Sequence, residues 1–227
     1  MEPTGMKAYF QDNAHQPGME YPRALRFIGH FFSFVFHPLF IPGYIAAFLL
    51  FVHPYAFAGA PAKLRLFRFL SVFFSTAFLP AFSVFLLKQL RFIDSIYLRT
   101  QKDRIIPYII CMVYYFWIWY VSRNLHESTE MTAMLLATFI ASILGLMANI
   151  YFKISMHGLA AGTLLVFFLW LAFTGSVQLG GYLSLAVLVT GLICTARFLV
   201  SNHNPFEIYA GLLGGALCQL AAIFIAG

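Results

Sequence analysis

The sequence predicts an all-α protein, a polytopic bundle of six to seven transmembrane helices, from three observations. Of its 227 residues, 61% are hydrophobic and only 10% are charged, whereas soluble domains carry about 25% charged residues. The mean hydropathy is +0.82, which excludes an ordinary water-soluble domain. The apolar residues also lie in runs of roughly 20, the length that a helix needs to cross a bilayer.

The apolar runs give the expected helices in chain order. Seven runs are long enough to be candidate spans, namely 31–52, 67–88, 106–122, 131–151, 158–175, 181–200 and 206–226. Pro42 and Pro80 interrupt the first two runs, so kinked or re-entrant forms of these would lower the number of spans to six. Residues 1–30 are polar and are expected to form a loose or interfacial arm, followed by a single transmembrane domain over residues 31–227.

The net charge of +6 does not indicate nucleic-acid binding, because the basic residues are scattered through short loops. In such loops they orient spans and meet anionic lipid headgroups. The cysteines, Cys111, Cys194 and Cys218, lie in apolar runs without metal-ligand spacing and are interpreted as packing residues. We therefore expect no cofactor, no metal and no nucleic acid, with membrane lipids as partners. The expected location is the inner or plasma membrane of a bacterium.

Three polar segments at the ends of the runs are candidates for function, because charged groups are costly inside a bilayer. They contain, in chain order, Lys102 and Arg104; Ser155 and His157; and Arg197, His203 and Glu207. Two spans separate the first segment from the second, and two more separate the second from the third. All three segments are therefore expected on one face of the membrane, where they could form one site.

The residue types in these segments suit the chemistry of a phosphate ester. A phosphomonoester carries close to two negative charges near neutral pH, and the planar guanidinium of arginine matches the geometry of phosphate oxygens. An imidazole with a carboxylate behind it, as in His203 and Glu207, can act as a nucleophile or a base.

Together these residues resemble the type-2 phosphatidic acid phosphatase family, within the lipid phosphatase and vanadium haloperoxidase superfamily. That family carries the motifs Lys-x6-Arg-Pro, Pro-Ser-Gly-His and Ser-Arg-x5-His-x3-Asp. The third motif is matched in spacing by Arg197, His203 and Glu207, the second by Ser155 and His157, and the first loosely by Arg104 with Lys102. The chain has Ala196 in place of the family's serine and glutamate in place of its aspartate.

The resemblance implies an integral membrane lipid-phosphate phosphatase that works without a metal. In that interpretation His203 attacks phosphorus and forms a phosphohistidine, and Glu207 orients it. His157 protonates the leaving alcohol and later activates water. Arg104, Arg197, Lys102 and Ser155 would bind the phosphate and stabilise the charge of the transition state.

Structural roles are the alternatives for the same residues. Glu207 is also the third residue of a capping-box pattern that starts at Asn204, and Ser155 could simply cap the span that follows it. Arg104 and Lys102 could be membrane-surface anchors. For the whole chain, the alternative is a non-catalytic transporter or a scaffold that binds anionic lipids. The membrane face that carries the site is left open, since the basic residues that would set the topology are partly those that would bind phosphate.

Overall fold

The computed structural model describes residues 21–93, 101–175, 178–201 and 203–227. Helices make up 82% of the structure, and these residues contain no strand, so the all-α prediction is confirmed. The helical segments are α2 (Arg23–Val35), α3 (Ile41–Ala47), η2 (Phe48–Val52), α4 (Ala62–Phe73), η3 (Phe74–Phe78), α5 (Leu79–Gln89), α6 (Gln101–Asn124), α7 (Thr129–Tyr151), α8 (Met156–Thr174), α9 (Gly180–Val200) and α10 (Pro205–Ala226). The segments η2 and η3 are π-helical.

Six helices among the described residues are long and apolar enough to cross a membrane. One of them is continuous through α4, η3 and α5, and the others are α6, α7, α8, α9 and α10. The number agrees with the lower of the two predicted counts. The chain is therefore an integral membrane protein by the length and composition of its helices.

The first predicted span, 31–52, is not one helix. It breaks between α2, which ends at Val35, and α3, which begins at Ile41, and α2 itself extends across the predicted boundary at residue 30. Proline explains the break: Pro38 disfavours helical backbone at the residue before it, and Pro42 lies in the first turn of α3, where its missing N–H costs nothing. A broken pair of short helices replaces the seventh span.

Pro80 does not break the second span, because the helix adjusts around it. Proline lacks the N–H that would bond the carbonyl four residues earlier, which here is the carbonyl of Thr76. The π-helical turn η3 precedes Pro80, and the hydroxyl of Tyr115 on α6 donates to the Thr76 carbonyl over 3.4 Å. A neighbouring helix thus supplies the donor that proline removes, as expected for a buried span.

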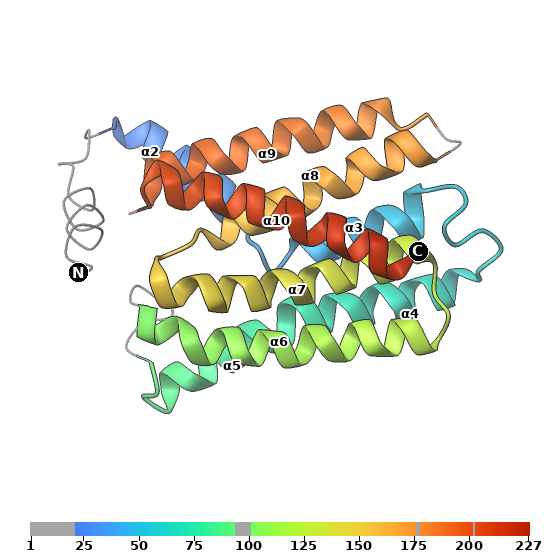
Figure 1. Cartoon of the computed structure of the whole chain (residues 1–227), viewed down its shortest axis with the longest axis horizontal. Helices are drawn as coiled ribbons and strands as arrows, with labels where there is room; N and C mark the ends of the chain where they lie inside the picture. The colour runs from blue at the N-terminus through green and yellow to red at the C-terminus, as the bar shows by residue number, and fades with distance from the viewer. Residues whose placement is uncertain (1–20, 94–100, 176–177, 202) are drawn as a thin grey trace, which may run out of the picture.

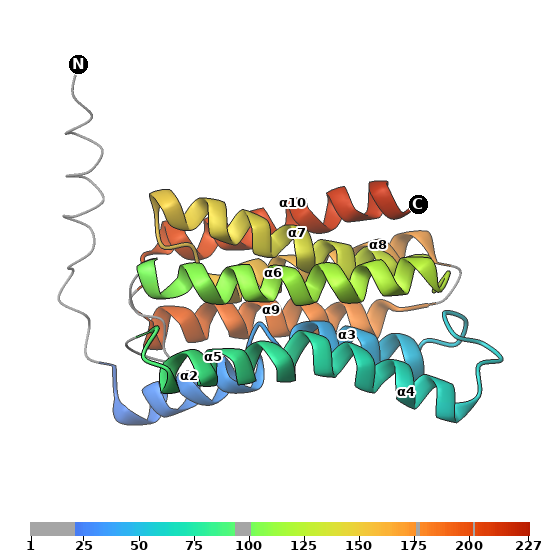
Figure 2. The same cartoon turned by 90° about the horizontal axis from the view of Figure 1, so that it is seen from below.

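The helices run nearly parallel or antiparallel, and the three polar segments lie at one end of the bundle (Figures 1 and 2). At this end, called the site end below, α5, α7 and α9 finish and α6, α8 and α10 begin. The three polar segments thus share one end of the bundle, as the parity of the predicted spans requires. The helix α2 lies beside α9 at the same end.

Glycines bring α8 and α10 into backbone contact. A Cβ atom on Gly211 would lie 2.7 Å from the Ser155 carbonyl oxygen, and one on Gly158 would lie 2.7 Å from the Ile208 carbonyl oxygen. Further along the helices, a Cβ atom on Gly215 would overlap with the Leu159 carbonyl. Small residues allow such close approach between membrane helices, where van der Waals packing drives association. This contact fixes the start of α8 against the first turns of α10.

The glycine contact predicts that Gly215→Val destabilises the protein. The added methyl groups would meet backbone atoms of α8, which cannot rotate away, and overpacking of this kind costs about 1–3 kcal/mol. Thermal unfolding of purified protein in detergent should show a lower Tm. The matched control is Gly191→Val in α9, where an added Cβ meets no atom within 4 Å. Equal Tm values for the two variants would contradict the role of the contact.

Candidate functional site

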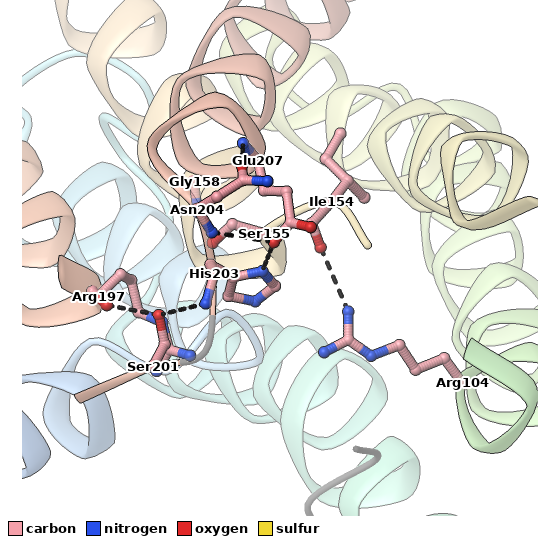
Figure 3. Close-up of polar contacts among 9 residues, drawn as sticks. All are labelled: Arg104, Ile154, Ser155, Gly158, Arg197, Ser201, His203, Asn204 and Glu207. Atoms are coloured by element: carbon pink, nitrogen blue, oxygen red, sulfur yellow. Dashed lines mark hydrogen bonds and ion pairs between the residues drawn. The ribbon is translucent and has the colours of Figure 1, made fainter. Parts of the chain in front are cut away.

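Most of the predicted site residues lie together at the site end, on the connections between helices and the turns beside them, and Figure 3 shows Arg104, Ser155, Arg197, His203 and Glu207 there. Ser155 and His157 lie at the start of α8, and Arg197 lies in the last turn of α9. His203 precedes α10, Glu207 lies in its first turn, and the guanidinium of Arg104 reaches in from the first turn of α6.

His203 and Glu207 form a hydrogen-bonded pair. The Nδ1 atom of His203 lies 2.7 Å from Oε2 of Glu207. The same Oε2 accepts the backbone N–H of Asn204 over 3.3 Å, while the Asn204 side chain accepts the N–H of Glu207 over 2.8 Å. The capping box is therefore present together with the histidine contact. One carboxylate both starts the helix and holds the imidazole.

The contact with Glu207 sets the protonation of the His203 ring. A carboxylate can only accept, so Nδ1 of neutral His203 carries the proton and Nε2 keeps its lone pair. Burial lowers the pKa of His203, and the hydrogen bond and charge of Glu207 oppose this effect, while the charges of Arg197 and Arg104 add to it. His203 is therefore held neutral, with a nucleophilic nitrogen, between two cations.

Hydrogen bonds between the helix ends place Arg104 and Ser155 near His203 and Glu207. Gln101 and Asn149 exchange side-chain to backbone hydrogen bonds of 2.9 Å each, which ties the start of α6 to the end of α7. From there Arg104, which is only 8% exposed, donates from Nη1 to the Ile154 carbonyl over 3.3 Å. The backbone N–H of Ser155 donates to the Glu207 carbonyl over 3.1 Å. The second and third polar segments are thus joined directly.

Ser155 has the structural role that was its alternative. Its hydroxyl oxygen accepts the backbone N–H of Gly158 over 3.2 Å and caps α8. Ser155 is fully buried. Its O–H proton is still a donor, because the cap uses only a lone pair of the oxygen.

Arg197 approaches the site from α9. Its Nη1 atom lies 3.5 Å from the Ser33 hydroxyl of α2, and its buried Nε–H has no hydrogen-bond partner among the described residues. Ser201 connects this arginine to the histidine, since its hydroxyl donates to the Arg197 carbonyl and accepts the backbone N–H of His203 over 3.4 Å. The sequence did not point to Ser201, because its role depends on the turn that follows α9.

His157 is held by residues that sequence reasoning did not include in the site. Its Nε2 atom lies 3.1 Å from the backbone carbonyl oxygen of Ser33, and its ring packs edge-on against His37, with ring centroids 5.4 Å apart. His37 was not among the predicted site residues, although its ring contacts that of a residue that was. Only the break between α2 and α3 brings these residues to the start of α8.

Two lysines at the site end lie in different settings. Lys102, which was expected to bind phosphate, is exposed at the start of α6, and no described contact joins it to the other site residues. Lys153, which was not among the predicted site residues, is half-buried beside the cluster. Burial lowers the pKa of Lys153, as do the charges of Arg104 and Arg197, whereas Glu207 raises it. Lys153 is therefore the lysine that lies within electrostatic reach of both arginines and the carboxylate.

The cluster has more positive than negative groups. Among the described residues, the charges of Arg104, Arg197 and Glu207 all act on Lys153 in a partly buried setting. Like charges repel strongly where water is scarce, so an anion placed among them would relieve an unfavourable arrangement. Among the described residues, no group of three or more His, Cys, Asp or Glu side chains is positioned to hold a metal ion. The arrangement is suited to binding an anion next to a nucleophilic imidazole.

Comparisons of the chain with protein-family models, with curated proteins and with solved structures found no match.

The double role of Glu207 can be separated by two substitutions. Glu207→Gln keeps an oxygen that can cap α10 but removes the charge, so the pKa of His203 should fall further below its ordinary value. Asn204→Ala removes the cap, at a typical cost of about 1 kcal/mol in stability, and should leave the His203 pKa nearly unchanged. NMR titration of the imidazole together with thermal unfolding measures both effects. Equal pKa changes in the two variants would show that Glu207 acts only as a cap.

His37 should make the protein less stable in mild acid. Burial, and then the charge of Arg197, lower the pKa of His37 from 6.5 to about 4. Between these values the unfolded state binds more protons than the folded state, so stability is lost as the pH falls from about 6.5 toward 4. The loss at pH 4.5 should be about 2 to 3 kcal/mol.

The matched variant for this effect is His37→Gln, which is neutral at both pH values. Its Tm in detergent should fall less than that of the parent protein between pH 7.5 and pH 4.5. If the Tm of His37→Gln falls between pH 7.5 and pH 4.5 by as much as that of the parent protein, His37 is not a source of the acid sensitivity.

Proposed function

We propose that the chain is an integral membrane lipid-phosphate phosphatase, which hydrolyses a phosphomonoester or diphosphate of a membrane lipid through a phosphohistidine. One observation carries the proposal: a histidine oriented by a carboxylate through Nδ1, with its Nε2 lone pair among an excess of cations. Three segments distant in sequence supply this arrangement. The resemblance of Arg197, His203 and Glu207 to the third motif of the phosphatidic acid phosphatases supports the same function.

In the first step the cations bind the phosphate. Arg104 and Arg197 offer N–H donors to its oxygens, and Lys153 adds positive charge, in the role that the sequence suggested for Lys102. Nε2 of His203 attacks phosphorus as the bond to the lipid oxygen breaks, and the leaving oxygen takes a proton from His157, which enters this step as the doubly protonated imidazolium. Charge spreads over the equatorial phosphate oxygens in the transition state, where fixed cations stabilise it. The products are a lipid alcohol and a phosphohistidine.

In the second step water releases the phosphate. His157, now neutral, takes a proton from a water molecule as the water oxygen attacks phosphorus. The bond between phosphorus and Nε2 breaks, and the electron pair returns to His203. Glu207 stabilises the imidazolium character that His203 gains in the intermediate. Inorganic phosphate leaves, and both histidines return to their starting states.

The position of the site favours an amphiphilic substrate. The cluster lies at the ends of helices that are long enough to span a membrane, and the ends of such helices reach the headgroup region of a bilayer. A phosphate on a membrane lipid reaches this level while its chains stay in the bilayer. Phosphatidate, phosphatidylglycerophosphate, polyprenyl (di)phosphates and lipid A phosphates all share this geometry.

The test is phosphate release by purified protein in lipid nanodiscs from a panel of these lipid phosphates. His203→Ala should abolish turnover, and His157→Ala should reduce it on the order of 10²- to 10⁴-fold, the usual contribution of a general acid or base. The control is His126→Asn, an exposed position in the turn after α6 with a positive φ of 51°, which asparagine tolerates. Turnover that survives loss of both His203 and His157 would refute the mechanism. Tight binding of lipid phosphates without turnover would favour the scaffold or transporter.

A further inference from the structure

The last turn of α2 leaves one carbonyl for His157. The final four carbonyls of a helix have no partner within it. In α2 the carbonyls of Phe32 and Phe34 accept the backbone N–H groups of Phe36 and His37, over 2.9 and 3.3 Å. The Val35 carbonyl accepts the Tyr44 hydroxyl over 2.7 Å. The fourth, the Ser33 carbonyl, is the one that contacts Nε2 of His157 over 3.1 Å.

This contact sets the tautomer of His157. A carbonyl oxygen only accepts, so Nε2 of His157 carries a proton and donates it. The lone pair of the neutral ring is then on Nδ1, which is the nitrogen that can exchange a proton with the substrate. The two histidines of the site are oriented through opposite nitrogens, His203 through Nδ1 and His157 through Nε2.

His37 limits the rotation of the His157 ring. The two rings meet at an interplanar angle of 79° with centroids 5.4 Å apart. Nδ1 of His37 accepts the backbone N–H of Leu39 over 3.3 Å, so the neutral ring is itself fixed by the connection from α2 to α3. His157 is thus held at one nitrogen by a hydrogen bond and along one edge by a second ring.

The packing of α2 against α9 holds the Ser33 carbonyl in place. Gly29 is buried against α9, and a Cβ atom added there would lie 2.6 Å from Cγ1 of Val200 and 3.3 Å from Cβ of Leu199. Gly29 lies one helical turn before Ser33, so any displacement of α2 from α9 at Gly29 moves the Ser33 carbonyl as well. The contact between Arg197 and the Ser33 hydroxyl lies at the same level.

We propose that α2 and its connection to α3 are the positioning element of His157. They hold its ring with Nδ1 free to give a proton to the leaving group and to take one from water. The partner in this contact is a neutral carbonyl, which accepts from Nε2 in both the neutral and the protonated ring, as a group that alternates between two protonation states requires. This inference rests on the proposed phosphatase function.

The deciding variant is Gly29→Leu, with Gly191→Leu as its matched control. Both place leucine in a helix at a glycine, but only position 29 faces another helix, since an added Cβ at Gly191 meets no atom within 4 Å. The readout is the level of phosphohistidine during turnover of an aryl phosphate, whose good leaving group needs no proton. Formation of the intermediate then does not need His157, whereas its hydrolysis does.

We expect Gly29→Leu to accumulate phosphohistidine, as His157→Ala should, and to hydrolyse the intermediate at least 10-fold more slowly than the parent. Gly191→Leu should resemble the parent, and His203→Ala should form no intermediate. If Gly29→Leu does not fold, His37→Ala decides, because it removes the packed ring without disturbing the seat of α2. Hydrolysis of the intermediate at the parent rate in the folded variant would overturn the proposal.

A second readout does not need turnover. The ¹⁵N NMR shifts of the His157 ring should report a protonated Nε2 in the parent and in Gly191→Leu, and a mixture of tautomers in Gly29→Leu. If the parent releases no phosphate from any substrate but has this tautomer pattern, the phosphatase function fails while the placement of His157 stands. A parent ring protonated at Nδ1 would refute the placement itself.

Discussion

The site depends on the backbone contact between α8 and α10. Glycines let these helices approach so closely that the Ser155 N–H bonds to the Glu207 carbonyl over 3.1 Å. The two helix starts are then one unit, since each cap supports the other: Ser155 caps α8, and Asn204 with Glu207 caps α10. This unit also positions His203, because its hydrogen-bond partner Glu207 is one of the capping residues of α10.

The electrostatics of the cluster follow from its position at helix ends. The amino ends of α6, α8 and α10 converge there, and each carries the partial positive charge of a helix start. Arg104, Arg197 and Lys153 add full charges, and Glu207 offsets only part of them. Arg197 lies in the last turn of α9, where the negative end of that helix stabilises it, whereas Arg104 lies in the first turn of α6, where the helix dipole disfavours a cation. The same arrangement gives a bound anion backbone and side-chain donors together, as helix amino ends commonly do for phosphate.

Most of the fold could be predicted from the sequence, because length and hydropathy determine which runs cross a bilayer and parity determines which ends share a face. The convergence of Arg104, Arg197, His203 and Glu207 could be predicted for the same reason. The break of the first run was harder to predict, since Pro38 and Pro42 allow either a kink or a full interruption. Ser33, His37 and Lys153 could not be assigned to the site: their contacts depend on how α2 seats on α9 and on where the connection before α8 turns inward.

The carbonyl that holds His157 belongs to the backbone, and this has an evolutionary consequence. Every amino acid carries the same carbonyl, so the contact with His157 does not require serine at position 33, although the Ser33 hydroxyl also contacts Arg197. The contact requires that α2 end at the same place and that a small residue at position 29 let α2 pack closely against α9. A motif read from side chains would not register such a partner, and related chains could keep it with no common residue at the position that provides it. The contact depends on the position of the backbone. The sequence indicates it only indirectly, through Gly29 and through the prolines that follow the helix.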